Sequence, residues 1–134
     1  ALHQRRHKAG RKIEETYFRC AKSLIAAGAA GDDADRALGF PLELVAETNP
    51  YRTPALRLRL LYRGKPLSDA LVVAFSKVEP LAKLKARTGN DGRVEFTLPR
   101  SGTWLVTSVH MIPASFFSGY DWQSLWASLT FERP

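Results

Sequence analysis

The 134-residue sequence holds only one cysteine, Cys20, and one methionine. A single cysteine cannot form an internal disulfide, which excludes the small scaffolds that disulfides hold together. No apolar run approaches the ~20 residues that a membrane-spanning helix needs. No apolar stretch follows the basic first residues, so we do not expect them to be a secretory signal. What remains is a composition close to the globular norm, with 45% hydrophobic and 25% charged residues, which predicts a chain able to bury a core.

Positive charge is concentrated near the start of the chain. The net charge is +7, and residues 1–22 hold seven Lys or Arg against two Glu. Such a basic arm could bind nucleic acid or an anionic membrane surface, although a solvated tail is the plainer interpretation. The interleaving of aromatic and basic residues that is typical of single-strand binders is missing. We therefore expect no nucleic-acid partner.

The first 39 residues are expected to form a basic arm, a short regular segment and a flexible linker. Residues 1–12 are expected to be irregular. Residues 13–27 favour a helix capped by Gly28, but a short helical turn that becomes an extended strand near Tyr17–Ile25 fits as well, because the periodicity does not decide between them. Residues 28–39 are small and polar, which predicts a loop.

From residue 40 to residue 134 the pattern predicts strands. The stretch "ALRLRLLYR" alternates leucine with arginine, as a strand with one buried face does. About six such strands, joined by Gly/Pro turns and, over residues 79–91, by a basic polar connection, predict a mainly β, Ig-like antiparallel sandwich of two sheets. The residues expected in its core are Leu56, Leu58, Leu60, Val94, Phe96, Leu98 and Trp104.

Residues 88–111, "TGNDGRVEFTLPRSGTWLVTSVHM", are the most regular stretch. Asn90-Asp91-Gly92 predicts a tight turn, because Gly adopts positive φ without steric cost. Pro99 ends the strand that follows. The next strand places Trp104 and His110 on the same face, with His110 near its end.

Several motifs carry resemblances to known families. "RGKPLSDALVVAF" followed by "TGNDGRVEFTLPRSGTWLVTSVHM" resembles the turn, strand and hairpin signature of transthyretin-like and Cna-B-like sandwich domains. "PLELVAETNP", "LRLRLLYRGKPL" and "DWQSLWASLTFE", with "TYFRCAKSLI" before them, resemble the NikM-like family, the periplasmic component of cobalt/nickel ABC transport.

The NikM-like resemblance implies a non-enzymatic, extracytoplasmic and specifically periplasmic binding module that is accessory to cobalt or nickel uptake. It would need no cofactor, would handle Ni²⁺ or Co²⁺, and would have membrane transporter subunits as partners. The alternative is a structural or ligand-recognition sandwich, for carbohydrate or a protein partner, with no metal role.

Candidate metal ligands are few. His110 and Asp121 flank an aromatic loop and could supply imidazole and carboxylate to Ni²⁺ or Co²⁺. Two ligands make a weak site, so structural roles are the favoured interpretation for both. Ala1-Leu2-His3 would form a nitrogen site for Cu²⁺ or Ni²⁺ if Ala1 were a free amino terminus, and His7 could add a ligand.

An aromatic cluster is the candidate surface for a ligand or a partner. It consists of Phe116, Phe117, Tyr120, Trp122 and Trp126. Exposed, these side chains would recognise a partner or a sugar, and buried, they would close one end of the sandwich, which we favour.

Catalysis finds little support in the sequence. No serine sits in a strand-turn-helix nucleophile elbow. Cys20 has Arg19 and Lys22 nearby, which could lower the pKa of its thiol, but a packing role is the plainer interpretation. We therefore expect a protein that is not an enzyme.

Overall fold

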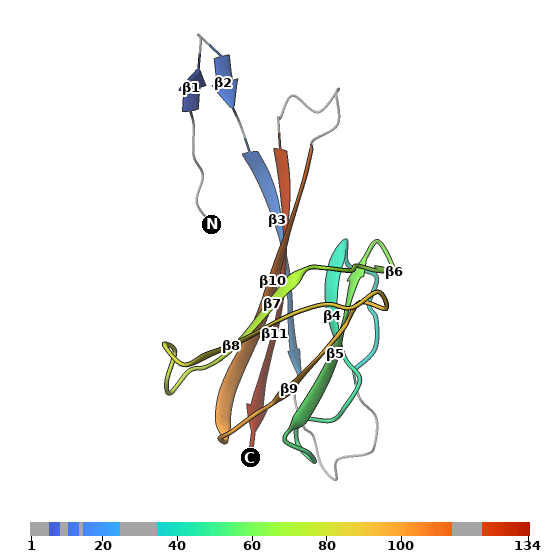
Figure 1. The fold of residues 1–134 in the computed structure, drawn as a ribbon, viewed down its shortest axis with the longest axis vertical. Helices are drawn as coiled ribbons and strands as arrows, with labels where there is room; N and C mark the ends of the chain where they lie inside the picture. The colour runs from blue at the N-terminus through green and yellow to red at the C-terminus, as the bar shows by residue number, and fades with distance from the viewer. Residues whose placement is uncertain (1–5, 9–10, 14, 25–34, 114–121) are drawn as a thin grey trace.

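The computed structural model describes residues 6–8, 11–13, 15–24, 35–113 and 122–134. These residues form strands and connections with no helix, and two sheets pack face to face as a sandwich (Figure 1). No helix in this part of the chain is long and apolar enough to cross a membrane. The expected antiparallel β-sandwich is confirmed.

The first sheet has five strands in the order β3-β11-β10-β7-β8. All neighbours are antiparallel except β3 and β11, which run parallel over ten residue pairs from Glu15–Trp122 to Leu24–Phe131. The strands are β3 (Glu15–Leu24), β7 (Leu71–Ser76), β8 (Lys83–Arg87), β10 (Gly102–Pro113) and β11 (Trp122–Arg133).

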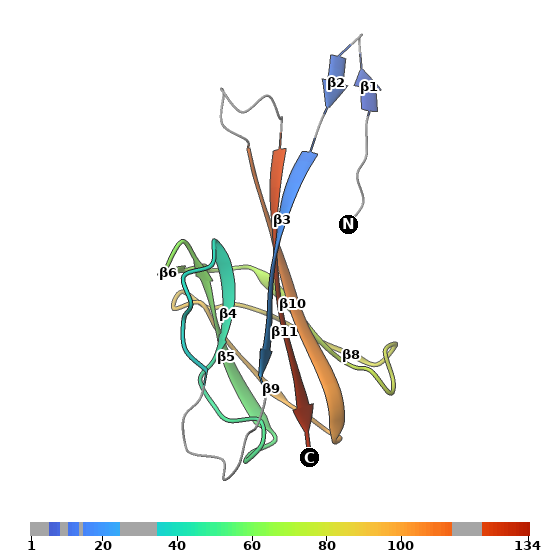
Figure 2. The same ribbon diagram turned by 180° about the vertical axis from the view of Figure 1, so that it is seen from behind.

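The second sheet is shorter and is built around one central strand. It contains β4 (Leu42–Ala46), β5 (Ala55–Tyr62), β6 (Lys65–Pro66) and β9 (Arg93–Thr97). β5 pairs antiparallel with each of the other three. The strands β3, β10 and β11 of the first sheet extend well beyond the end of β4 and β5, which leaves a step at that end of the sandwich (Figures 1 and 2).

The core lies between the sheets and follows the predicted alternation. All seven residues expected there are buried: Leu56, Leu58, Leu60, Val94, Phe96, Leu98 and Trp104. Arg57 is exposed on the opposite face of β5. The apolar area removed from water by these side chains is the main term that favours folding.

The segment left open between helix and strand is a strand. β3 covers most of the predicted 13–27 segment and is hydrogen-bonded along its length to β11. Helix-favouring composition is a weak prior, and pairing with an available sheet edge overrides it. The segment before residue 40 thus supplies an edge strand of the larger sheet.

Two other expectations were wrong. The basic arm is not wholly irregular, because β1 (Arg6–Lys8) and β2 (Arg11–Ile13) form a two-stranded antiparallel sheet. The connection over residues 79–91 contains β8, in which exposed Lys and Arg alternate with the half-buried Leu84 and Ala86. This is a period-two strand pattern, and lysines are common on edge strands because they oppose pairing with other chains.

Candidate functional site: a pocket at the step between the sheets

A pocket of about 500 Å³ lies where the second sheet stops and the first continues. We call it the step pocket. It is lined by Phe18, Gly39, Phe40, Pro41, Arg63, Gly64, Gln123 and Leu125. Phe18, Gln123 and Leu125 come from the first sheet, and Arg63 and Gly64 form the turn between β5 and β6.

One wall of the pocket is held by a buried carboxylate. Glu43 in β4 accepts hydrogen bonds from the backbone N–H groups of Leu38 at 2.7 Å, Gly39 at 3.0 Å and Phe40 at 3.2 Å. The N–H of Arg63 donates to the carbonyl of Pro41 at 2.9 Å, which ties this wall to the β5–β6 turn. The pocket is therefore preformed by backbone contacts, as small-molecule sites usually are.

Glu43 belongs to a buried charge network that joins β3 to the second sheet. The Nζ of Lys22 lies 2.8 Å from Glu43 Oε2 and 2.6 Å from Asp35 Oδ2, and all three side chains are almost wholly buried. The Nζ of Lys22 also donates to the carbonyl oxygens of Arg36 at 3.1 Å and Leu44 at 3.2 Å. The four hydrogen-bond partners of Nζ among the described residues are all oxygen acceptors, which suits a charged ammonium.

The hydrogen bonds of Glu43 decide its ionisation. Burial alone would raise the pKa of this carboxyl. The hydrogen bond from Lys22, the N–H groups of Leu38 and Phe40 and the positive charge of Lys22 outweigh burial, so that the pKa is lowered. Glu43 is thus an ionised anchor for the pocket wall, and it has no proton to give at neutral pH.

Arg63 is the one charged side chain that lines the step pocket. It has φ +51° and Gly64 has φ +80°, as in the two-residue turns that suit the twist of a β-hairpin. Its guanidinium lies 5.3 Å from the centre of the Tyr62 ring. No carboxylate among the described residues forms an ion pair with Arg63. Its N–H donors are therefore available to a ligand in the pocket.

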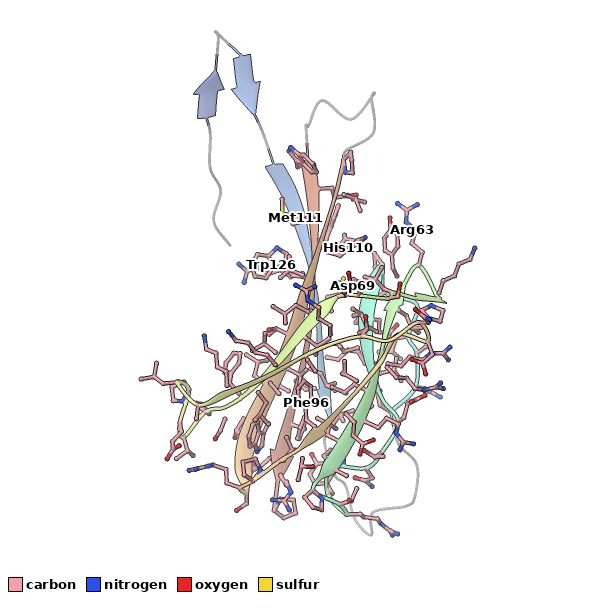
Figure 3. The ribbon with its side chains drawn as sticks, in the orientation of Figure 1. Arg63, Asp69, Phe96, His110, Met111 and Trp126 are labelled. Atoms are coloured by element: carbon pink, nitrogen blue, oxygen red, sulfur yellow. The ribbon has the colours of Figure 1, made fainter. Side chains whose placement is uncertain are left out.

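His110 lies on β10 at the step (Figure 3), where its ring contacts that of Tyr62. The two rings meet edge to face with centroids 4.8 Å apart, and His110 pairs in register with Leu125 of the pocket. Burial lowers the pKa of His110, because the charged imidazolium is poorly solvated there. Within the described ranges, no group of three or more His, Cys, Asp or Glu side chains could hold a metal ion.

The remaining predicted site residues are not brought together by the described part of the structure. His3, Phe116, Phe117, Tyr120 and Asp121 lie outside the described residues, and His7 lies in β1 with an undescribed side chain. Trp122 is exposed and Trp126 half-buried. Trp126 faces away from the second sheet, beside Arg19, whose guanidinium lies 6.0 Å from its ring (Figure 3).

The sequence interpretation missed the residues that build the pocket. "PLELVAE" alternates apolar and acidic residues, which places Glu43 on a solvent face, yet Glu43 is buried. Its partner Lys22 is 21 residues away in the sequence and Asp35, the other carboxylate that accepts from Lys22, is 8 residues away, with no recognisable spacing. Arg63 had a usable signal, because an Arg-Gly pair between "LRLRLLY" and "KP" is a two-residue hairpin turn.

Comparison with known proteins identifies a family. The sequence model of a family described as a domain of unknown function, DUF4198, matches residues 3–112. No curated protein and no solved structure matches the chain.

Proposed function

Because the chain belongs to the DUF4198 family, whose description names no activity, we propose a function from the site itself. The protein is a non-enzymatic binding module, and the step pocket holds its ligand. The observation that carries this proposal is a preformed, mainly apolar pocket with one arginine at its wall, for which the described residues supply no ion-pair partner. Pockets of this size and character bind small molecules.

The side chains of the step pocket define the ligand class. Phe18, Phe40 and Leu125 offer apolar surface, and Phe18 is 51% exposed although it is a large aromatic residue. Arg63 offers a planar set of N–H donors that fits a carboxylate. The ligand is therefore a small molecule with an apolar or aromatic body and one anionic group.

The same lining favours binding over catalysis. The eight residues include no His, Cys, Ser, Asp, Glu or Lys, the side chains that act as nucleophiles or as general acids and bases. Glu43 lies behind the wall, with its oxygens occupied by donors.

A role in cobalt or nickel uptake is the second proposal, and its support is the resemblance of the "PLELVAETNP", "LRLRLLYRGKPL" and "DWQSLWASLTFE" motifs to the NikM-like family. In this role the module works in the periplasm beside membrane transporter subunits. His110 is the described imidazole nearest to the step, and lowering of its pKa by burial keeps it in the neutral form that binds metal.

Amide NMR spectra of the ¹⁵N-labelled chain test both proposals. Titration with 2-naphthoate should shift the amide signals of Gly39, Phe40, Gly64 and Gln123, and Phe18→Ala should weaken this binding. Arg63→Gln should weaken binding of 2-naphthoate more than that of the neutral 2-naphthamide, whereas Arg87→Gln, a change of an exposed arginine on β8, should affect neither. If no amide signals shifted, or if the shifted signals belonged to residues elsewhere on the chain, the proposal that the step pocket binds this class of ligand would be refuted.

Adding paramagnetic Co²⁺ to the same labelled chain tests the metal role. Broadening centred on His110 that disappears in His110→Ala would support the metal role. Broadening that persists in this variant, or none at all, would count against a metal site at the step.

A further inference from the structure

The connection between β7 and β8 ends in an apolar tip. Val78 is 69% exposed and Leu81 is 94% exposed, and Pro80 and Ala82 beside them are exposed as well. We call these four residues the β7–β8 tip. Single exposed apolar side chains are ordinary, but four within five residues at the end of a loop are a patch that needs a reason.

The local geometry does not supply that reason. The N–H of Ala82 donates to the carbonyl of Glu79 at 3.1 Å, which closes a β-turn with Pro80 and Leu81 at its centre. Proline suits the first central position of such a turn, but the second usually holds Gly, Asn, Asp or Ser. Leu81 therefore brings no benefit to the turn, and its side chain packs on little or nothing within the described chain.

The base of the tip is tied to the sandwich. The N–H of Lys77 donates to the carbonyl of Thr103 at 2.9 Å, and the N–H of Val78 donates to Ser76 Oγ at 3.2 Å. Arg100 forms an ion pair with Glu79 at 3.0 Å. This pair neutralises the single acidic side chain of residues 77–87.

The tip stands clear of both sheets. Figures 1 and 2 show the β7–β8 connection projecting from the side of the molecule that faces away from the second sheet. Little of the tip is covered by the rest of the described chain, so a partner can reach it without rearrangement.

Basic side chains form a collar behind the tip. Residues 77–87 carry four Lys or Arg against Glu79 alone. Lys77 precedes the tip, and Lys83 and Lys85 follow it on β8, all three exposed. Lys83 is two residues from Leu81, so at about 3.3 Å per residue the collar begins at most ~7 Å behind the tip.

We propose that the β7–β8 tip docks on an anionic lipid surface. The apolar tip enters the boundary between headgroups and acyl chains, and the lysine collar meets the phosphates. Apolar faces of interfacial proteins enter this boundary to a depth of about 5–10 Å, which matches the spacing between tip and collar. Anionic leaflets attract basic residues near the surface, within about one Debye length.

The shape of the tip favours a lipid surface over a protein partner. A stable protein interface buries roughly 800 Å² on each side, with a packed centre. The β7–β8 tip, with four small or medium apolar side chains, is far smaller than that, so a protein partner would have to enclose it in a matching socket. A bilayer needs no socket, because its interface accepts any small apolar group that can enter the boundary between headgroups and acyl chains.

Co-sedimentation of the full chain with lipid vesicles tests the proposal. The chain should bind phosphatidylcholine vesicles that contain phosphatidylglycerol, and binding should weaken as salt rises. The double variant Val78→Ser, Leu81→Ser should bind at least about tenfold more weakly, since two aliphatic side chains lose their burial. Lys83→Gln and Lys85→Gln should each weaken binding about fivefold.

Matched controls separate the tip from other causes. Met111→Ser removes another exposed apolar side chain, and Lys65→Gln removes an exposed lysine of the second sheet, so both should bind as the unchanged protein does. Because all these positions are exposed, thermal unfolding should be unaltered. If the tip double variant kept full binding, the basic residues of the arm would be responsible and the proposal would be wrong. Failure of the unchanged chain to bind anionic vesicles, as for a tip that serves an acidic protein, would overturn it too.

Discussion

The strands β10 and β11 pass through two different environments along their length. Where the second sheet covers these strands, Trp104 and Val106 are buried. Phe96 of the second sheet, labelled in the lower part of Figure 3, is buried as well. At the end of β5, the same inner face carries His110, which is half-buried, and Phe18 of β3, which pairs with Leu125 one strand away from His110, is exposed. Alternation along the strands continues unchanged across this boundary. The second sheet ends at the Arg63-Gly64 turn, and its length therefore decides where the buried core ends and the step pocket begins.

The sharpest way to break this comparison is to truncate one aromatic residue in each environment. Trp104→Ala should lower the free energy of unfolding by about 3–5 kcal/mol, because it leaves a cavity. It also removes the hydrogen bond from Trp104 Nε1 to the carbonyl of Arg100 at 3.0 Å. Phe18→Ala should cost less than about 1 kcal/mol, because roughly half of this side chain already faces water. Urea unfolding followed by circular dichroism measures both. Equal losses would mean that the step is as well covered as the core.

The charge network at the boundary should give the next largest effect. Lys22→Met keeps most of the side-chain volume but leaves the buried carboxylates of Asp35 and Glu43 without their cation. We expect a loss of about 3 kcal/mol in urea unfolding, near the lower end for breaking a buried ion pair. Arg57→Met is the control, because the pair of Arg57 with Glu95 is half-exposed and should contribute less than about 1 kcal/mol. A result in which the two variants were equally stable would show that the network does not fasten β3.

The smallest effect is a dependence of stability on pH that arises at His110. The pKa of this residue is lowered from 6.5 in the folded state, so the unfolded chain binds the proton more readily. Above pH 6.5, His110 should therefore have no effect on the free energy of unfolding. As the pH drops below 6.5, this free energy should fall. Glu43, with a pKa lowered from 4.5, begins to add its own loss only below that value. Urea unfolding at several pH values between 4.5 and 6.5 measures the contribution of His110. His110→Gln should flatten the dependence of the free energy of unfolding on pH in this range. An unchanged dependence would assign the effect to other groups.

The sequence predicted what is encoded locally. Alternation placed the leucines of β5 in the core, and the turn at Asn90-Asp91-Gly92 was confirmed in detail. Gly92 has φ +76°, and a Cβ at this position would lie 2.7 Å from the carbonyl oxygen of Leu60, so only glycine fits. The alternation and the turn signal depend on a few neighbouring residues, which is why the sequence shows them, whereas the close approach of Leu60 to Gly92 is visible only in the fold.

Features that depend on distant partners were beyond the sequence. β3 is a strand because β11 offers it an edge, and no local pattern in "TYFRCAKSLI" indicates this. Glu43 is buried in a strand whose alternation points it outward, because Lys22 and three backbone N–H groups compensate for its charge. The step pocket arises where these two features meet, and so it could not be predicted before the fold was known.

The parallel pairing of β3 with β11 also constrains how the chain is made. Each residue of β3 pairs with a residue 107 positions later, as Glu15 does with Trp122 and Leu24 with Phe131. At about 5–20 residues per second, a ribosome needs roughly 5–20 s to add that much chain. During this time β3 has been synthesised but its partner has not, and an unpaired strand edge invites association with other chains. The larger sheet can therefore close only after β11 has emerged, which makes the interval between the synthesis of β3 and that of β11 the time at which the edge of this sheet is most exposed to misassembly.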